Sequence, residues 1–279
     1  MPLHPGARGL EDDAALLEIG GETLVLTHDT MVEGRHWLPG QDMADVAWKL
    51  VAVNLSDLAA KGAEPFGILL GHTLGEGDER FIEGLREVTE KYQVPLLGGD
   101  TVSGGGPRTL GLTAIGRATH TPVPSRTGAQ VGNAIYLTGE VGAAMLGFEA
   151  LKRGSKEPSV AYRRPEPLLV AGQALAPHVT AMMDISDGLL LDAFRMAEAS
   201  EVTIAIECKL APVASLERRD ECLRWGDDYQ LLFTLPPETK PPVECSRIGQ
   251  VEAKGFAPLV LDGNPLVNAR GLGYEHRGS

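Results

Sequence analysis

The spacing of hydrophobic residues predicts alternating strands and helices in the first part of the chain. Residues 23–27 (TLVLT) form a β-rich apolar run and are expected to be a strand that ends at His28 and Asp29. Residues 44–61 carry apolar side chains at helical spacing, with Asp42 as the expected N-cap and Gly62 as the expected stop. The other elements expected here are strands at 68–70, 94–97 and 108–115 and a helix at 78–92.

The same alternation continues after a connection rich in proline and threonine at residues 119–125 (THTPVPS). We therefore expect two domains, residues 1–120 and residues 121–279. The elements expected in the second are strands at 134–137, 202–206, 230–234 and 258–261 and helices at 141–151, 165–175 and 188–199. This pattern predicts an α+β protein made of two mixed α/β domains.

The composition of the 279 residues narrows the class of protein. Hydrophobic residues make up 43% and charged residues 23%, as in an ordinary globular protein. The formal net charge of −13 argues against nucleic acid as the main partner, because phosphate backbones are bound by Lys and Arg. It does not exclude phosphorylated small molecules, since bound magnesium reverses the local sign of the charge.

Cysteine usage and the apolar runs indicate where the protein works. Cys208, Cys222 and Cys245 form no C-x-x-C pair, which argues against a zinc site or a disulfide framework and fits a reducing cytoplasm. Residues 1–9 lack the apolar core of a signal peptide. No apolar run approaches the roughly 20 residues that span a membrane. We therefore expect a cytoplasmic protein without a membrane partner.

Aspartates recur at predicted strand ends and in glycine turns, where loops commonly present ligands. Magnesium prefers oxygen ligands and usually takes one or two carboxylates together with substrate phosphates. The alternative for any single aspartate is a helix cap or a turn. That alternative fails for Asp57, which lies inside an apolar helical pattern where an unpaired carboxylate is costly to bury. The six acidic clusters are Asp12-Asp13, Asp29, Asp57, Asp100, Asp184 with Asp187, and Asp227-Asp228.

The segment Asp184–Gly188 (DISDG) is the most specific of these motifs. Apolar residues flank it on both sides, and Ser186 or Asp187 can cap a helix that begins near Gly188. A helix N-terminus attracts phosphate, so the motif suits both a metal and a phosphate, with simple capping as the alternative. Residues 98–101 (GGDT) offer further backbone N–H groups to a phosphate.

Two basic side chains are further candidates. His36 follows a loop and either meets a phosphate or the substrate, or is an incidental surface histidine. Arg126, at the expected domain boundary, has the planar fork of donors that suits a phosphate, although an exposed arginine is otherwise ordinary surface. The sequence contains no Walker A motif, and no G-x-G-x-x-G in a strand–helix setting.

Six motifs together resemble those of the thiamine-monophosphate kinases, which belong to the aminoimidazole-ribotide synthetase-like ATP-binding superfamily. The resemblance extends in order from about residue 9 to residue 274, nearly the whole chain. The runs NLSDLAA and DDYQLLF separate this family from its cousins better than any single motif does. The motifs are residues 12–15 (DDAA), 27–36 (THDTMVEGRH), 53–63 (VNLSDLAAKGA), 98–101 (GGDT), 184–189 (DISDGL) and 226–233 (GDDYQLLF).

The resemblance implies transfer of the γ-phosphoryl group of ATP to thiamine monophosphate, with several Mg²⁺ ions. It implies a homodimer in which the sheets of the N-terminal domains pair across the interface, with the nucleotide nearby. It also implies that the C-terminal αβ domain completes the nucleotide and substrate site. The alternatives are another ATP-using enzyme of the superfamily with a different acceptor, or a nucleotide-binding regulatory protein without turnover.

Carried over by motif, the implied site has three groups of residues, of which we expect Asp57, Asp100 and Asp187 to be catalytic. We further expect metals to be bridged by Asp29, Asp57 and Asp100. The metal-ligand positions are Asp13, Thr27, His28, Asp29, Asp57, Asp100, Asp184 and Asp187. The nucleotide positions are Tyr92, Gly99, Asp100, Arg126 and Ser186. The substrate positions are His36, Asp227 and Tyr274.

The sequence departs from the family pattern at three of these places. Glu11 stands where the family usually has Gly, and His28 stands where it usually has Thr or Ser. Asp227 stands where the family usually has Glu, which shortens the substrate-side carboxylate by one methylene. A ligand at His28 that acts through the backbone carbonyl survives the change, whereas one that acts through a hydroxyl does not.

Overall fold

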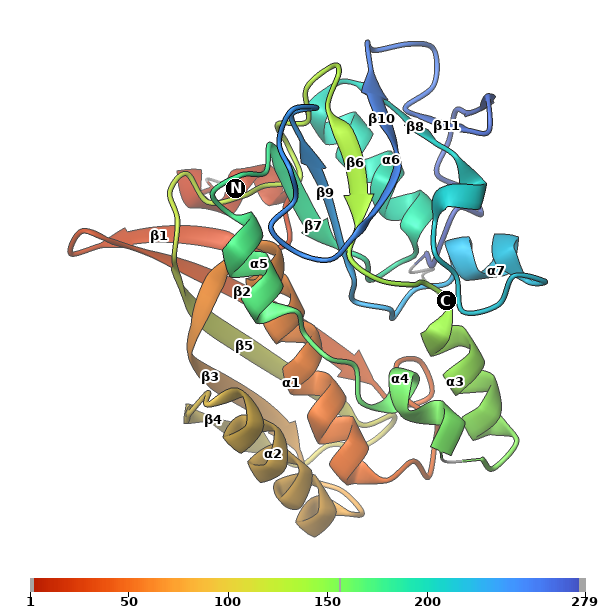
Figure 1. The fold of residues 1–279 in the computed structure, drawn as a ribbon. Helices are drawn as coiled ribbons and strands as arrows, with labels where there is room; N and C mark the ends of the chain where they lie inside the picture. The colour runs from red at the N-terminus through yellow and green to blue at the C-terminus, as the bar shows by residue number, and fades with distance from the viewer. Residues whose placement is uncertain (1–2, 156, 276–279) are drawn as a thin grey trace.

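The structure, a computed structural model, describes residues 3–155 and 157–275 and contains two β-sheets (Figure 1). The first sheet has the order β1-β2-β5-β3-β4, in which only β3 and β4 run parallel. A 3-10 helix at Pro5–Leu10 precedes it. Its strands are β1 (Ala15–Ile19), β2 (Glu22–Val32), β3 (Ala63–Thr73), β4 (Leu96–Val102) and β5 (Thr109–Ala118).

Helices α1 (Met43–Ala60) and α2 (Asp78–Tyr92) pack together on one face of this sheet (Figure 1). Side chains of β2 alternate between that face and the opposite face, so Val25 and Met31 are buried against α1. Every residue of α1 except Met43 and Asp57 is buried, because the helix lies between the first sheet and the second half of the chain. Asp42 caps it, with a carboxylate that accepts a hydrogen bond from the backbone N–H of Ala44.

The second sheet has the order β12-β11-β8-β10-β6-β9-β7, and α6 (Leu189–Ser200) packs against it through a separate hydrophobic core. The smaller helices are α3 (Ala143–Lys152), α4 (Val160–Arg163), α5 (Leu169–Leu175) and α7 (Arg219–Arg224), with 3-10 turns at Glu157–Ser159 and Cys208–Leu210. The strands are β6 (Ala134–Leu137), β7 (Ala181–Asp184), β8 (Thr203–Ile206), β9 (Leu231–Leu235), β10 (Ser246–Glu252), β11 (Leu259–Leu261) and β12 (Asn264–Leu266).

The mixed α/β fold with two sheets is confirmed, and so are the helices expected at 44–61 and 78–92. The helix expected over 165–175 is too long, because prolines at 165 and 167 delay its start to Leu169. Strands β2 and β4 are longer than expected, so Asp29 and Asp100 lie within strands and not beyond their ends. Strands β1, β7, β10 and β12 were not expected at all. The division at residue 120 stays a prediction.

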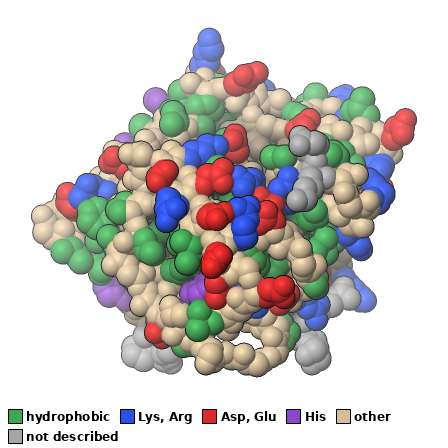
Figure 2. Space-filling view, turned by 90° about the horizontal axis from the view of Figure 1, so that it is seen from below, with side chains coloured by type: hydrophobic (Ala, Val, Ile, Leu, Met, Phe, Trp, Pro, Cys, Tyr) green, Lys and Arg blue, Asp and Glu red, His purple; other side chains and the backbone are tan. Residues whose placement is uncertain are grey.

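Charges on the lower face of the molecule are balanced locally. Figure 2 shows acidic and basic side chains side by side on this face. Near α2, Arg80 pairs with Asp42 at 2.9 Å, and Arg164 pairs with Glu87 at 2.7 Å. In the described part of the chain, no helix combines the length and apolar character that a membrane crossing requires.

Candidate active site

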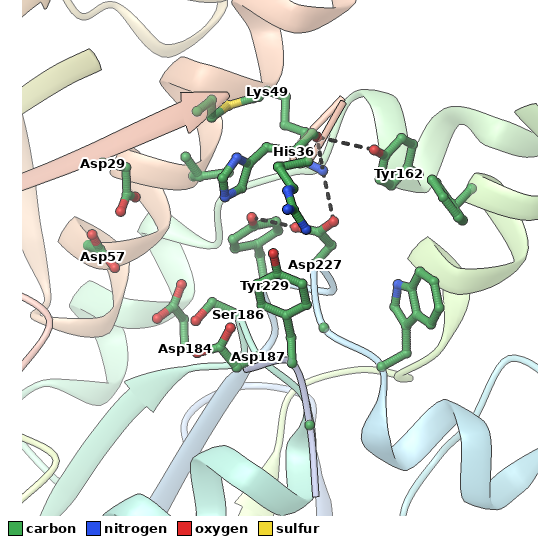
Figure 3. A pocket seen from close by; sticks show the side chains of 18 of the residues that line it. Asp29, His36, Lys49, Asp57, Tyr162, Asp184, Ser186, Asp187, Asp227 and Tyr229 are labelled. Atoms are coloured by element: carbon green, nitrogen blue, oxygen red, sulfur yellow. Dashed lines mark hydrogen bonds and ion pairs between the residues drawn. The ribbon is translucent and has the colours of Figure 1, made fainter. Parts of the chain in front are cut away.

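A cavity of about 600 Å³ lies where α1 and β2 meet the turns of the second half (Figure 3). Asp29, Asp57 and Asp184 gather on one side of it, and Lys49 and Tyr162 lie on the other. Residues of the sequence prediction that line it are Asp29, His36, Asp57, Asp184, Ser186, Asp187, Asp227 and Tyr274. The fold therefore brings together most of the predicted acids and all three predicted substrate positions.

Two hydrogen bonds help to position Asp29 and Asp57 in the first half of the chain. Asp29 faces α1 because it shares the inner face of β2 with Thr27 and Met31. Its backbone N–H donates to the side-chain oxygen of Asn54 at 3.1 Å, which ties β2 to α1. The hydroxyl of Thr27 donates to the carboxylate of Asp57, which points from α1 toward the cavity. A regular strand and a regular helix thus position both acids.

Asp184 joins these acids from the second half of the chain. It is the last residue of β7, and its carboxylate accepts a hydrogen bond of 2.5 Å from the hydroxyl of Ser56 on α1. Carboxylate oxygens of Asp13, Asp57 and Asp184 all lie within 4.8 Å of one another. Acids from β7, α1 and the segment before β1 therefore converge on one point, an arrangement that oxygen-seeking divalent cations require.

Burial and mutual repulsion raise the pKa values of Asp29, Asp57 and Asp184. Burial, together with the charges of Asp29, Asp184 and Asp13, raises the pKa of Asp57 well above its usual value. Burial and the charge of Asp13 raise the pKa of Asp184 to about 7. Burial raises the pKa of Asp29, which accepts no hydrogen bond on its carboxylate from the described residues. The cluster lacks enough positive charge, and a magnesium ion fits that deficit.

The prediction that Ser186 or Asp187 caps the helix after Gly188 is wrong. No side chain caps α6; instead the buried carboxylate of Asp192 accepts hydrogen bonds from the backbone N–H groups of Ser186 at 3.2 Å and Asp187 at 3.1 Å. The side chain of Asp187 pairs with Arg195 at 2.5 Å. Because Asp192 satisfies the turn, the acids of the motif face the cavity.

A second turn, at Gly226 to Tyr229, is joined to this one by backbone hydrogen bonds. The N–H of Asp227 donates to the carbonyl of Ser186, and the N–H of Tyr229 donates to that of Ile185, both at 2.8 Å. Gly226 is required here, since a Cβ would lie 2.1 Å from the Ser186 carbonyl oxygen. Asp227 and Tyr229 adopt positive φ angles of 65° and 52°, a strained conformation often found at functional sites.

At the end of the cavity near this turn, a lysine and an aspartate neutralise each other. The ammonium of buried Lys49 pairs with Asp227 at 2.8 Å and lies 3.9 Å from the centroid of the Tyr162 ring. The hydroxyl of Tyr229 donates to the other oxygen of Asp227 at 2.9 Å. The Nδ1 atom of His36 accepts a hydrogen bond from the N–H of Val32 at 2.9 Å, which leaves Nε2 to carry the hydrogen of the neutral ring.

Aromatic rings line the same end. Phe148 lies 5.1 Å from Tyr162 and 5.4 Å from Trp225, measured between ring centroids. Asp228, next in sequence to Asp227, points elsewhere and caps α3 by accepting the N–H groups of Gly142 and Ala144. Of the two adjacent aspartates, only Asp227 lines the cavity.

Asp13, which belongs to the cluster, and its neighbour Asp12 are surrounded by cations. Buried Lys61 pairs with Asp12 at 2.5 Å and with Asp13 at 2.9 Å, and Arg126 also bonds to Asp13. Burial alone would raise the pKa of Asp12, but Lys61, Ser125 and Arg8 lower it to about 2. The same cations hold the pKa of Asp13 below its usual value against the effect of burial.

Other predicted positions lie away from the cavity within one chain. Gly99 and Asp100 are exposed on the edge strand β4, and the register places Gly99 three strands from Asp29, roughly 14 Å in a flat sheet. A single chain therefore does not bring Asp29 and Asp100 to one metal. The His28 side chain points to the face opposite α1, where it bonds to Thr113 at 2.8 Å. Tyr92 lies at the end of α2 and packs edge-on against Trp48.

Sequence reasoning missed several charged residues of the site. Lys49 and Lys61 were overlooked, although both lie in the same apolar helical pattern that singled out Asp57. That signal was available, because a charged side chain in such a pattern must find a buried partner. Asp192 carried the same signal, since it lies in the apolar run of the helix expected at 188–199. What the sequence did not reveal is that Asp192 and Arg195 support a turn several residues away.

Comparison with family models gives two matches along the chain. The model described as AIR synthase related protein, N-terminal domain, matches residues 11–118. The model described as AIR synthase related protein, C-terminal domain, matches residues 130–259.

Among curated proteins, the chain is 35% identical to the thiamine-monophosphate kinase of Escherichia coli (strain K12), over 96% of this chain and 91% of that protein. It is also 35% identical to the thiamine-monophosphate kinase of Caulobacter vibrioides, over 98% and 86% of the two chains. The solved structure of AaThiL complexed with AMPPCP and TMP superposes with a TM-score of 0.84 at 29% identity, covering 93% of this chain and 92% of that one. Hydrogenase maturation protein HypE shares the fold, with a TM-score of 0.71 at 22% identity, covering 90% of this chain and 86% of that one.

Proposed function

The chain belongs to the thiamine-monophosphate kinases, within the AIR synthase related proteins, and we propose that its cavity transfers the γ-phosphoryl group of ATP to thiamine monophosphate. The product is thiamine diphosphate. One observation carries this proposal: a single cavity joins three aspartates, none of them in a salt bridge within the described residues, to an aromatic end with a paired lysine and aspartate. The relatives that carry this name, and the structure with AMPPCP and TMP, support it.

The chemistry of the reaction explains the acidic cluster. The acceptor is already a phosphate oxygen that is anionic at neutral pH, so it needs little help from a general base. Catalysis consists mainly of bringing two polyanions into line and offsetting their charge. Bound magnesium ions supply that positive charge and polarise the transferred group. Asp29, Asp57 and Asp184 line the cavity and are proposed to hold them, and Asp187 lines it as well.

The opposite end suits the thiamine part of the acceptor. Thiamine consists of an aminopyrimidine and a cationic thiazolium ring, which favour aromatic faces and a carboxylate. Phe148, Tyr162 and Trp225 offer the faces, and Asp227, held by Lys49, offers the carboxylate. His36 and Tyr274 line the same cavity and are proposed to contact the substrate.

The remaining nucleotide positions are proposed to act in a homodimer. Strand β4 is an unpaired edge whose residues are all exposed, and apolar side chains such as Phe66, Leu69 and Leu97 are exposed on the same sheet. An exposed apolar edge of this kind invites pairing with another chain. We propose that a second copy covers it, so that Gly99 and Asp100 approach a nucleotide near the interface.

The compartment proposed for this activity is the cytoplasm. Cys208, Cys222 and Cys245 are free thiols in the structure, which supports a reducing environment. Magnesium and ATP are abundant there, and the reaction requires both.

Turnover with MgATP tests the proposed function directly. Thiamine diphosphate formed from thiamine monophosphate, and not from thiamine or an unrelated monophosphate, is the expected result. ATP binding without thiamine diphosphate would contradict it and favour a regulatory protein. Turnover with a different acceptor only would assign the site to another reaction of the superfamily.

A further inference from the structure

Lys61 is a fully buried cation at the end of α1, beside the acidic cluster. Its side chain has no exposed surface, and its ammonium lies 2.5 Å from an oxygen of Asp12 and 2.9 Å from an oxygen of Asp13. A buried ammonium is costly to desolvate and persists only where its donors are satisfied by carboxylates. Lys61 therefore depends on the carboxylates of Asp12 and Asp13 to remain charged and buried.

Asp13 is the point where this ion-pair group meets the acidic cluster. One of its carboxylate oxygens accepts from Lys61, and the other accepts from the guanidinium of Arg126. A carboxylate oxygen of the same residue nevertheless lies within 4.8 Å of oxygens of Asp57 and Asp184. Geometry alone therefore makes Asp13 a metal ligand, but two cations already occupy its oxygens.

The other acids of the cluster differ in this respect. Asp57 accepts a hydrogen bond from the hydroxyl of Thr27, and Asp184 accepts one from the hydroxyl of Ser56. Among the described residues, no salt bridge involves Asp29, Asp57 or Asp184. A dication gains the full attraction of these three carboxylates, whereas at Asp13 it meets the repulsion of two fixed cations.

We propose that Lys61 is a fixed cation that takes the place of a metal ion on the Asp12–Asp13 side of the cluster. Asp13 is then an ion-pair partner of Lys61 and Arg126, and Mg²⁺ binds on the side of Asp29, Asp57 and Asp184. Lys61 acts as a positioning residue: it restricts where metal binds and neutralises Asp12 and Asp13 when metal is absent. This inference rests on the proposed function only for the identity of the metal.

The first test is equilibrium binding of Mn²⁺ to the nucleotide-free full chain, followed by electron paramagnetic resonance. It asks whether the metal binds at Asp29, Asp57 and Asp184 and not at Asp13. In Asp13→Asn, Lys61 keeps Asp12 as its carboxylate partner, and the Mn²⁺ affinity should stay within about twofold of the unmodified protein. Asp29→Asn should weaken it by about tenfold or more, because it removes a direct ligand. Equal losses in the two variants would overturn the proposal.

Lys61→Met tests the cation itself. Without Lys61, a divalent ion can bind at Asp12 and Asp13, so the variant should bind one more Mn²⁺ per chain than the unmodified protein. Its metal-free melting temperature should fall by roughly 5–10 °C, since two buried carboxylates lose a partner. Added Mg²⁺ should restore most of that loss. An unchanged metal count would overturn the proposal.

Arg163→Met is the matched control for this variant. Arg163 pairs with buried Asp45 near the other end of α1, away from the acidic cluster. Its removal also breaks a buried ion pair, but Mg²⁺ should not restore its melting temperature. Should Lys61→Met fail to fold, the comparison of Asp13→Asn with Asp29→Asn still decides. None of these measurements uses turnover, so they test the role of Lys61 independently of the proposed kinase activity.

Discussion

At one end of the cavity, Asp57 and Asp184 accept hydrogen bonds only from hydroxyl groups among the described residues, and the Asp29 carboxylate accepts none. At the other end, Lys49 and Asp227 neutralise each other. Both ends are built by the same two halves of the chain. The difference lies in where the missing positive charge comes from. At the acidic end a bound ion would supply that positive charge, and the paired end carries its own.

This difference shows how a protein of net charge −13 can bind two phosphorylated molecules. A fixed cation such as Lys49 holds one partner in one geometry. A divalent ion held by the carboxylates of the acidic end would offset the charge of the phosphates as well, which suits the end where phosphate is transferred. Substitutions at the acidic end should therefore affect turnover more than stability, and those at the paired end should affect both.

The largest effect is expected from Asp57→Asn. The amide retains an oxygen for the Thr27 hydroxyl but loses the charge that a metal requires. We expect kcat to fall by about a thousandfold or more, while the metal-free protein melts at the same or a higher temperature because a repulsive charge is gone. Steady-state kinetics and thermal melting measure the two. Asp228→Asn, an acid that caps α3 outside the cavity, is the control and should lose only a few-fold in kcat.

A substantially lower melting temperature in the Asp57→Asn variant would show that this acid has a structural role. Full activity in the variant would remove Asp57 from the site.

Removing one member of the Lys49–Asp227 pair should cost both stability and acceptor binding. In Lys49→Met, Asp227 keeps the Tyr229 hydroxyl as its one side-chain partner among the described residues. We therefore expect about 2 kcal/mol of lost stability and roughly a hundredfold loss in kcat/KM for thiamine monophosphate. The double variant Lys49→Met/Asp227→Asn should recover stability without activity. If it instead recovers neither, the pair does not act as a unit.

The sequence predicted the acidic end better than the paired end. Asp57 was found because a carboxylate in an apolar helical run has no ordinary explanation, and Asp29, Asp184 and Asp187 came with their motifs. No sequence pattern predicted that Tyr162 and Phe148 line the cavity, since their positions depend on short helices whose packing is set by contacts distant in sequence. Strand β7 was missed for a similar reason: its four residues are all buried and show no alternation.

Motif and fold also diverge at Asp100. The family motifs group Asp100 with Asp29 and Asp57, but within one chain two strands, β5 and β3, lie between Asp100 on β4 and Asp29 on β2. No local pattern reveals strand order, because it is decided by pairing between segments far apart in sequence.

Asp192→Asn is expected to have an intermediate effect, since it acts on the acidic end through the backbone. Burial raises the pKa of the Asp192 carboxyl to about 8, so the comparison is made at pH 9, where the substitution replaces a charged acceptor of the Ser186 and Asp187 N–H groups with a neutral one. We expect KM for MgATP at this pH to rise by roughly thirtyfold, as hydrogen bonds to a charged group are worth about 1.5–3 kcal/mol, with a smaller change in kcat. Asp192→Ala should be worse than Asp192→Asn in both. A fall in kcat with KM unchanged would instead place Asp192 in the chemical step.

The smallest effect, about tenfold, is expected from pH, and it separates the two ends without mutation. Burial and the charge of Asp13 raise the pKa of Asp184 to about 7, and the pKa values of Asp29 and Asp57 are raised as well. A raised carboxyl pKa stabilises the fold while the group is protonated, so the metal-free protein should lose stability as pH rises from 6 to 8. Mg²⁺ needs the ionised form, so its affinity should rise about tenfold over the same range.

Thermal melting at pH 6, 7 and 8, with and without Mg²⁺, measures this effect. Burial also raises the pKa of Asp228 to about 7 and that of Asp192 to about 8, but neither side chain lines the cavity, so both contribute equally to the two curves. The difference between the curves therefore reports the acidic end alone, and it should widen with pH. A difference that stays constant or narrows would mean that the metal binds to carboxylates already ionised at pH 6, which would move the metal away from Asp184.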